Sequence, residues 1–190
     1  MTSLIWLPFL PLLGAFVPLF TARYSRTACA FMTAVLPAVT LFLVLSHASD
    51  IFHGEHFFAA VPWVPAIGLE LAFRLDGLSL LFSILILGIG LLVILYARYY
   101  LSAQDSIGKF YSYLILFMFS MLGVVLSDNL IQLWFFWELT SVSSFLLISF
   151  WGHKVEARKG ARMALTVTGA GGLALLAGLL LLGNTVGSYS

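Results

Sequence analysis

The sequence predicts an all-α integral membrane protein of about six transmembrane helices, with a short β-hairpin in the outer loop between spans two and three. Of the 190 residues, 62% are hydrophobic and only 9% are charged, whereas about a quarter of the residues are charged in a soluble domain. The apolar residues also gather into stretches of about 20, the length that crosses a bilayer as a helix. This composition excludes a soluble enzyme. The formal net charge of +1 gives no reason to expect a nucleic-acid partner.

Six apolar stretches have the length of a membrane span. Their predicted bounds are Leu4–Ala22, Thr27–Ser46, Gly77–Ala97, Phe110–Leu126, Leu130–Trp151 and Met163–Leu182. The first is read as a retained span and not as a signal peptide, because it lacks a basic start and is followed by "TARYSR" instead of a small-residue cleavage site.

Four prolines fall inside the first two predicted spans. Pro8, Pro11 and Pro18 lie in the first, and Pro37 lies in the second. They would break helices in water. Neighbouring helices can satisfy the freed carbonyls in a membrane, so we expect both spans to tolerate them.

The basic residues predict the orientation of the chain. With the N-terminus outside, the inner segments hold eight of the nine Lys and Arg residues, and only Arg74 lies outside. The eight are Arg23, Arg26, Arg98, Lys109, Lys154, Arg158, Lys159 and Arg162. The positive-inside rule therefore places the N-terminus and Ser190 on the outer face.

The predicted outer loop, from about His47 to Asp76, ends in a strand pattern. Apolar residues alternate strictly with Glu70, Ala72, Arg74 and Asp76, a period of two that is typical of a half-buried strand. The preceding "VPWVPAIG" supplies turn-forming residues, so we expect a small hairpin on the outer rim of the helices. Asp76 is then placed to cap the third span.

Several motifs admit a functional interpretation, but a structural one is favoured for each. The "HGEH" motif could offer His53, Glu55 and His56 to a metal, but it lies in a loop without an obvious third ligand, and a solvated polar loop is expected. The single cysteine, Cys29, excludes an internal disulfide and a cysteine-built metal site. It is expected to be a small residue facing lipid or a helix, and no metal or cofactor site is predicted.

Small and basic residues recur near the end of the chain. The "TGAGG" run at 168–172 does not follow a strand, so it is not read as a phosphate loop. Ala164, Thr168 and Gly172 recur every four residues and would let another helix approach closely; Gly88 and Gly90 are expected to serve similar packing. Lys154, Arg158 and Arg162 also recur every four residues, a stripe that suits inner-face topology and lipid headgroups, with a proton or cation access site as the alternative.

Glu138 is the residue for which function is favoured. It is the ninth residue of the fifth span, about 12 Å from the outer edge, and an ionised acid near a helix centre costs about 2.5–3.5 kcal/mol. The span must therefore turn Glu138 toward protein or water, on the side where Ser141 and Ser149 lie within about 60° around the helix. Desolvation and a nearby cation act oppositely on such a group, which suits a proton carrier. The alternative is a permanently neutral acid that hydrogen-bonds to a neighbouring helix.

The sequence around these spans resembles a known family. "VPWVPAIGLELAF" at 61–73, "FRLDGLSLLFSILILGIGLLVILYARYYLS" at 73–102 and "GVVLSDNLIQLWFFWELTSVSSFLLISFW" at 123–151 are similar to the A subunit of Mrp-type multisubunit sodium/proton antiporters. They resemble more distantly the large antiporter-like subunit of respiratory complex I. The motif "WELTSVSSFLLI" at 137–148 favours the Mrp type.

The resemblance implies an ion-translocating bundle within a larger assembly in the bacterial cytoplasmic membrane. Glu138 matches a family glutamate that pairs with a lysine on a later helix, and that lysine would lie beyond Ser190. The expected partners are other antiporter subunits, the lipid bilayer, and transported H⁺ and Na⁺ or another monovalent cation.

The resemblance also suggests three segments. These are 1–60 with the first two spans and the outer loop, 61–112 as a module like the N-terminus of complex I chain 5, and 113–190 as the start of the antiporter-like transmembrane domain.

Three functional hypotheses follow. The first is the N-terminal portion of a cation/proton antiporter subunit that contributes to Na⁺/H⁺ exchange, which would be a secondary transporter and not an enzyme. The second is the equivalent part of a proton-translocating subunit of complex I or a membrane hydrogenase. The third is a truncated, transport-inactive membrane scaffold.

Overall fold

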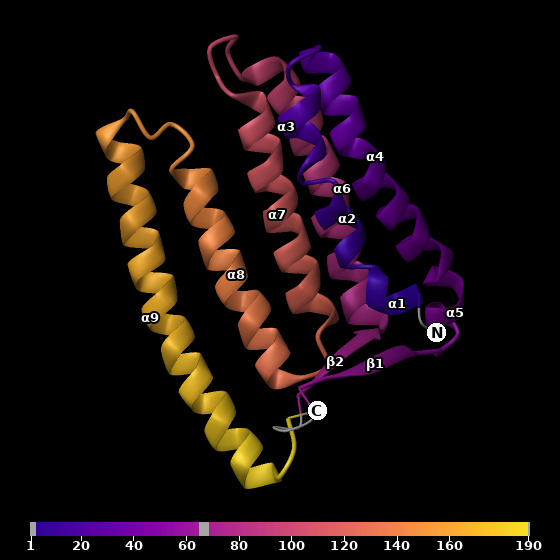
Figure 1. Ribbon diagram of the computed structural model, residues 1–190. Helices are drawn as coiled ribbons and strands as arrows, with labels where there is room; N and C mark the ends of the chain where they lie inside the picture. Colours follow the sequence, from indigo (N-terminus) through magenta and orange to yellow (C-terminus); the bar gives the residue numbers. More distant parts are fainter. Residues whose placement is uncertain (1–2, 65–68, 190) are drawn as a thin grey trace.

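The computed structural model describes residues 3–64 and 69–189, and they form a helical bundle with a two-stranded hairpin across one end (Figure 1). Within these residues, five helical segments are long and apolar enough to cross a membrane. The long helices are α4 (Arg26–Ser46), α6 (Gly77–Tyr100), α7 (Ile107–Leu126), α8 (Leu130–Ile148) and α9 (Val155–Val186). The predicted all-α membrane fold is confirmed.

The first predicted span is not one helix. It consists of α1 (Ser3–Trp6), α2 (Phe9–Leu13) and α3 (Val17–Thr21). Proline has no N–H and its ring clashes with the preceding turn, so helices restart near Pro8 and Pro18, which stand at the N-cap of α2 and in the first turn of α3. The expectation that this span tolerates its prolines within a continuous helix is therefore wrong, whereas α4 does continue past Pro37.

Neighbouring helices satisfy part of the backbone that these breaks leave free. The Ser112 hydroxyl of α7 donates a 2.7 Å hydrogen bond to the Ala15 carbonyl between α2 and α3. The buried Cys29 thiol of α4 lies 3.7 Å from the Pro18 carbonyl, which confirms its expected helix-facing position. The broken segment thus packs between α4 and α7.

The loop between α4 and the hairpin starts later than predicted. A further short helix, α5 (Ala48–Phe52), follows α4 directly, so the chain leaves helical structure at His53 and not at His47. The "HGEH" residues then form the turn into the hairpin, as expected of a polar loop.

The hairpin pairs β1 (Phe57–Val64) with β2 (Leu69–Leu75) in antiparallel register, from Phe57 opposite Leu75 to Val64 opposite Leu69. Its apolar face is confirmed, because Phe73 and Leu75 are fully buried. The expected turn residues at 61–64 instead belong to β1, with an irregular register between Pro62 and Val64; the rest of that stretch, 65–68, lies outside the described residues.

The last two helices differ in length from their predictions. α8 ends at Ile148, three residues before the predicted Trp151, and α9 begins at Val155, eight residues before Met163. The early turns of α9 carry exposed charged residues, and these turns are helical although they are too polar to count as a membrane span by hydropathy.

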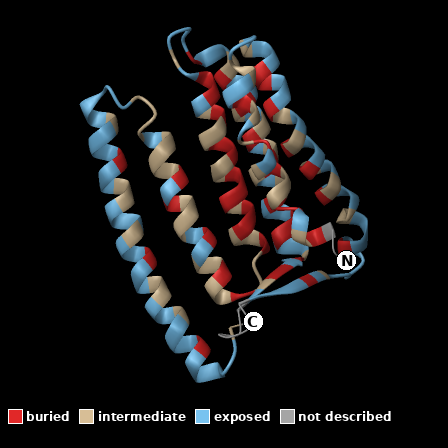
Figure 2. Ribbon diagram, viewed as in Figure 1, coloured by how far each residue is buried: buried red, intermediate tan, exposed pale blue. Residues whose placement is uncertain are grey.

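Eight of the nine basic residues lie on segments at the end of the bundle opposite the hairpin, and the ninth, Arg74, is in β2 (Figure 1). There the Arg26 guanidinium donates to the carbonyls of Leu101 and Ser102 at 2.8 and 2.7 Å, and Arg98 donates to the Thr27 hydroxyl. α7 is the most buried of the long helices, whereas α9 packs mainly against α8 and is largely exposed (Figure 2).

Candidate ion-translocation site

The candidate site is carried by α8, and buried amides hold the start of this helix. The Asn129 side-chain oxygen accepts hydrogen bonds from the amides of Ile131 and Gln132 at 3.0 and 3.1 Å, so Asn129 caps α8. Gln132, only 2% exposed, accepts from the Ala72 amide at 2.8 Å and donates to the Ala72 carbonyl at 3.0 Å. These bonds tie the first turn of α8 to strand β2 and set both its height and its rotation.

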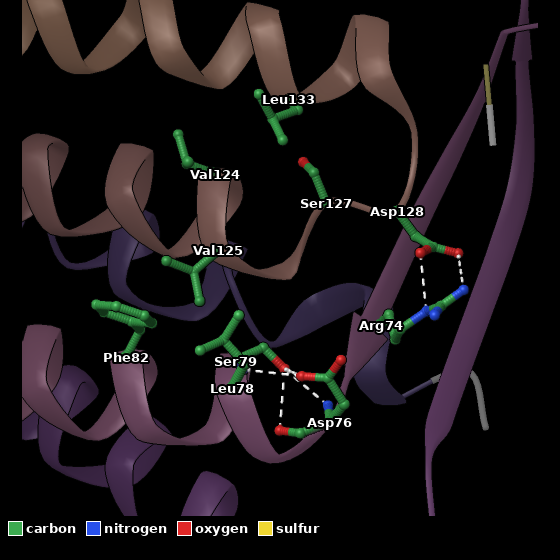
Figure 3. A pocket seen from close by; sticks show the side chains of 10 residues that line it. All are labelled: Arg74, Asp76, Leu78, Ser79, Phe82, Val124, Val125, Ser127, Asp128 and Leu133. Carbon is green, nitrogen blue, oxygen red and sulfur yellow. Dashed lines mark hydrogen bonds and ion pairs between the residues drawn. The ribbon is translucent and has the colours of Figure 1, made fainter.

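An ion pair lies at the same corner. The Arg74 guanidinium lies 2.8 and 3.0 Å from the two carboxylate oxygens of Asp128, beside a cavity of about 370 Å³ between β2, α6, α7 and α8 (Figure 3). Arg74, the one basic residue that the predicted topology places outside, is therefore neutralised by an acid that lies just before α8. Arg74 is about half exposed, so the pair itself adds little stability.

Asp76 caps α6, as the sequence predicts. Its carboxylate accepts from the Ser79 amide at 2.9 Å while the Ser79 hydroxyl accepts from the Asp76 amide at 2.7 Å (Figure 3), the reciprocal arrangement of a capping box. The Ser79 amide holds the pKa of this carboxyl below its ordinary value of 3.8. Its observed role is structural.

Glu138 lies six residues after Gln132 and faces α9. The backbone of Gly172 on α9 is so close that a Cβ added there would overlap the Oε1 atom of Glu138 and lie 2.8 Å from its Cδ. That Oε1 is buried, and it has no hydrogen-bond partner among the described residues. The side chain is therefore directed toward protein and not toward lipid.

A second contact joins the two helices at the same height. The Trp134 indole, one turn before Glu138, donates a 2.9 Å hydrogen bond to the Gly172 carbonyl. Neither Trp134 nor its bond to Gly172 was expected from the sequence. The regular spacing of Ala164, Thr168 and Gly172 was the available signal, and the close helix approach that it predicts is confirmed at Gly172.

A mainly apolar groove, which Glu138 does not line, lies near this contact. Its volume is about 560 Å³, and it lies between α7, α8 and α9. Thr140, Ser141, Ser144 and Thr168 supply its hydroxyls. Ser141 follows Glu138 by three residues within α8, the expected side of the helix, whereas Ser149 stands beyond the end of α8 and donates to the Leu146 carbonyl.

The other candidates do not join this site. Among the described residues no three His, Cys, Asp or Glu side chains are grouped as a metal site, and His53 bonds to the Ser49 carbonyl of its own helix. Gly90 packs closely on Met118 as expected, but a Cβ on Gly88 would meet nothing within 4 Å, so the packing role predicted for Gly88 is wrong within this chain.

The basic stripe lies at the opposite end from the hairpin. Lys154 lies over the Trp151 ring at 5.0 Å and Arg158 donates to the Gly152 carbonyl at 2.7 Å. The Trp151 indole in turn donates to Asp105 at 2.9 Å. The hydrogen bonds from Ser102 and Trp151 lower the pKa of the Asp105 carboxyl.

Two family models match the chain in the regions that build this site. Residues 63–111 match "NADH-Ubiquinone oxidoreductase (complex I), chain 5 N-terminus", and residues 127–190 match "NADH:quinone oxidoreductase/Mrp antiporter, TM". The second match contains Glu138, Trp134 and Gly172. Over 192 aligned residues, covering all of this chain, the sequence is 44% identical to the Na⁺/H⁺ antiporter A subunit of Alkalihalophilus pseudofirmus. The chain belongs to the family of Mrp-type antiporter A subunits.

Other relatives agree with this assignment. Over 91% of its own length, the Mrp-type chain is 47% identical to the Na⁺/H⁺ antiporter A1 subunit of Staphylococcus haemolyticus. Over 94% of its own length, it is 45% identical to a probable K⁺/H⁺ antiporter A/B subunit of Rhizobium meliloti. It spans only 18% to 24% of the length of these curated relatives.

Solved structures show the same fold. The Mrp complex of a Dietzia species matches with a TM-score of 0.85 and 31% identity, over 98% of this Mrp-type chain and 20% of that chain. An archaeal respiratory membrane complex, the membrane-bound sulfane sulfur reductase, matches with a TM-score of 0.79 over 98% of this chain and 28% of that chain. At 21% identity the second likeness shows the fold alone.

Proposed function

We propose that this chain contributes to the exchange of a monovalent cation, Na⁺ in the first instance, for H⁺ across the bacterial cytoplasmic membrane, within a multisubunit antiporter. Glu138 is the residue on which transport depends. Relatives named as Na⁺/H⁺ and K⁺/H⁺ antiporter subunits support the reaction class. The remaining subunits of such an assembly are the proposed protein partners, and the N-terminus lies outside.

The observation that carries this proposal is the placement of the Glu138 carboxyl. It lies near the middle of an apolar helix, and its buried Oε1 has no hydrogen-bond partner among the described residues. An unpaired buried charge is costly, so such a group either holds a proton or waits for a cationic partner. A carboxyl that alternates between these two states can take up and release a proton as a cation moves, which is the requirement of exchange.

The alternative structural role, a neutral acid that binds a neighbouring helix, is less well supported. A permanently protonated Glu138 would be expected to donate its proton to an acceptor on α9. The Gly172 carbonyl is already occupied by the Trp134 indole, and the part of the chain that the structure describes offers Oε1 no partner.

The test is Glu138→Gln in the complete protein, assembled with its partners and measured in membrane vesicles. Glutamine keeps the size of the side chain but cannot release a proton, so cation-dependent proton flux is expected to vanish while the complex still assembles. Glu156→Gln is the matched control, because Glu156 is an exposed acid in the first turn of α9; it is expected to exchange normally. Normal flux in the Glu138 variant would contradict the proposal.

A second candidate function is a proton-translocating part of a redox-driven complex. The match of residues 63–111 to a chain of complex I favours it. The same vesicles separate the two functions: an imposed sodium gradient alone should drive proton movement through an antiporter. A redox-driven pump would move protons only when an electron donor and acceptor are supplied.

A further inference from the structure

The Glu138 carboxyl rests directly on the α9 backbone. A Cβ built on Gly172 would overlap Oε1, and it would lie 2.8 Å from Cδ and 3.5 Å from Oε2. Every other amino acid has a Cβ, so only glycine leaves the carboxyl its present position. Gly172 is itself buried.

The Trp134 indole fixes the same residue from the neighbouring turn. It donates to the Gly172 carbonyl at 2.9 Å, and it lies four residues before Glu138, on the same face of α8. The carbonyl that it binds belongs to the residue that accommodates the acid, so the height of α9 relative to Glu138 is set at this point.

Charge does not explain the position of the carboxyl. The charged residues of α9 (Glu156, Arg158, Lys159 and Arg162) all lie within its first eight residues. The last of them is ten residues before Gly172, about 15 Å along the helix.

In the described part of the chain, the other elements that pack on α8 bring no free charge near Glu138 either. On α7, the charged residue is Lys109, near the opposite end of that helix from β2. On β2, Arg74 is paired with Asp128 and Glu70 is exposed. Steric fit against α9 is therefore what places Glu138.

We infer that Gly172 is a positioning residue for Glu138: with the Trp134 indole it forms a glycine niche that holds the carboxyl where transport requires it. The inference rests on the proposed function of Glu138. A methyl group at position 172 would meet the flexible end of the glutamate and not a backbone, so the acid moves before the helix does. Alanine also favours the helix over glycine, so α9 itself is not weakened.

The experiment compares Gly172→Ala with Gly169→Ala and Gly178→Ala in the complete protein within its complex. The two controls make the same chemical change on the same helix, but a Cβ at either position would meet nothing within 4 Å. Gly172→Ala is expected to lower cation/proton exchange by about tenfold or more, as displacements of about 1 Å do to reacting groups. The controls should exchange at the wild-type rate, and all three variants should assemble.

A second measurement reports on the carboxyl without transport. A hydrophobic carbodiimide reacts with protonated carboxyl groups within the membrane, and mass spectrometry gives the rate at which Glu138 is labelled. In Gly172→Ala, Oε1 is displaced from the α9 backbone that now shields it, so the labelling rate of Glu138 should rise several-fold. The labelling rate should be unchanged in both controls. Labelling at the wild-type rate would overturn the inference, and so would faster labelling with full exchange.

The two proposals fail in different ways. If Glu138→Gln retains exchange, the transport role of Glu138 is lost, but the labelling rates still report on the niche. If Glu138→Gln abolishes exchange while Gly172→Ala behaves as Gly169→Ala does, the transport role stands and the positioning role of Gly172 is refuted.

Discussion

At the scale of single residues, two polar side chains of α8 contrast in the partners of their buried atoms. Gln132 satisfies both its oxygen and its amide with Ala72 and adds a 3.0 Å bond to the Ser127 hydroxyl. The Glu138 Oε1 is buried without a partner among the described residues. A fully satisfied polar group specifies structure. The Ser83 hydroxyl and the Asn129 amide nitrogen are also buried without a partner among the described residues, but of the three only the Glu138 carboxyl can exchange a proton near neutral pH. The same helix thus carries an anchor and, six residues later, the proposed site.

Gln132→Leu tests the anchor. Leucine leaves the Ala72 amide and carbonyl without the bonds that the glutamine makes, and an unsatisfied buried group costs about 1–3 kcal/mol. We expect the variant to unfold at a lower temperature than the wild type in detergent. Tryptophan fluorescence during heating measures this unfolding temperature.

Gln104→Leu is the control for this change, because Gln104 is exposed in the loop before α7. It should alter the free energy of unfolding by less than about 0.5 kcal/mol. Equal effects of the two substitutions would show that Gln132 does not anchor α8.

At the scale of elements, the start of α6 depends on one carboxylate. The capping box between Asp76 and Ser79 satisfies amides that begin the helix. The strand β2 ends at Leu75, one residue earlier, so this cap converts an extended chain into a membrane span within a single residue. The hairpin and α6 are therefore held in a defined relation.

Asp76→Ala should destabilise the protein by about 1 kcal/mol, the usual effect of removing an N-cap. Asp50→Ala is its control, because Asp50 is an exposed acid in the first turn of α5. Thermal unfolding at neutral pH measures both changes, and no difference between them would contradict a capping role.

The same cap predicts a dependence on pH. The Ser79 amide lowers the pKa of Asp76 in the folded protein below 3.8, so folding favours the ionised form. The resulting stability is present above the unfolded pKa and is lost as the pH falls below 3.8 through the folded value. The difference in unfolding temperature between wild type and Asp76→Asn should shrink over that range. A difference that is constant down to the lowest pH would contradict this assignment.

At the scale of the whole molecule, the bundle is unevenly covered. α7 is largely buried by α2, α3, α6 and α8, whereas α9 packs on α8 and leaves most of its surface exposed (Figure 2). The chain spans about a fifth of its curated relatives. Glu138 contacts Gly172 between the last two helices, α8 and α9, and α9 is the least buried of the long helices.

The orientation of the bundle gives a prediction at this scale. The Cys29→Ser background removes the single thiol, and Glu55→Cys or Lys159→Cys then adds one at an exposed position at either end. An impermeant maleimide should label the Glu55 variant in intact cells, and the Lys159 variant only after the membrane is opened. Labelling in the reverse order would invert the proposed topology.

Composition and pattern were enough to determine the class of the fold, most of its elements and the residue of interest. Long apolar runs in a bilayer can only be helices, so the starts of α4, α6 and α8 follow within one residue from hydropathy, and the period of two in β2 follows from its half-buried face. Glu138 stands out because a charge in an apolar span is costly wherever the helix points. Local sequence is sufficient for these features because each depends on the contrast between a side chain and its solvent.

Tertiary structure decided which neighbours each polar group meets. Gln132 binds Ala72, which is 60 residues away along the chain. Trp134 binds Gly172, which is 38 residues away. The sequence shows all four residues but not that folding brings each pair together. The prolines interrupt the first span, but only the packing of α7 brings the Ser112 hydroxyl to the free Ala15 carbonyl, 97 residues away along the chain. Contacts of this kind join side chains across separate helices, and the packing of those helices determines which of them form.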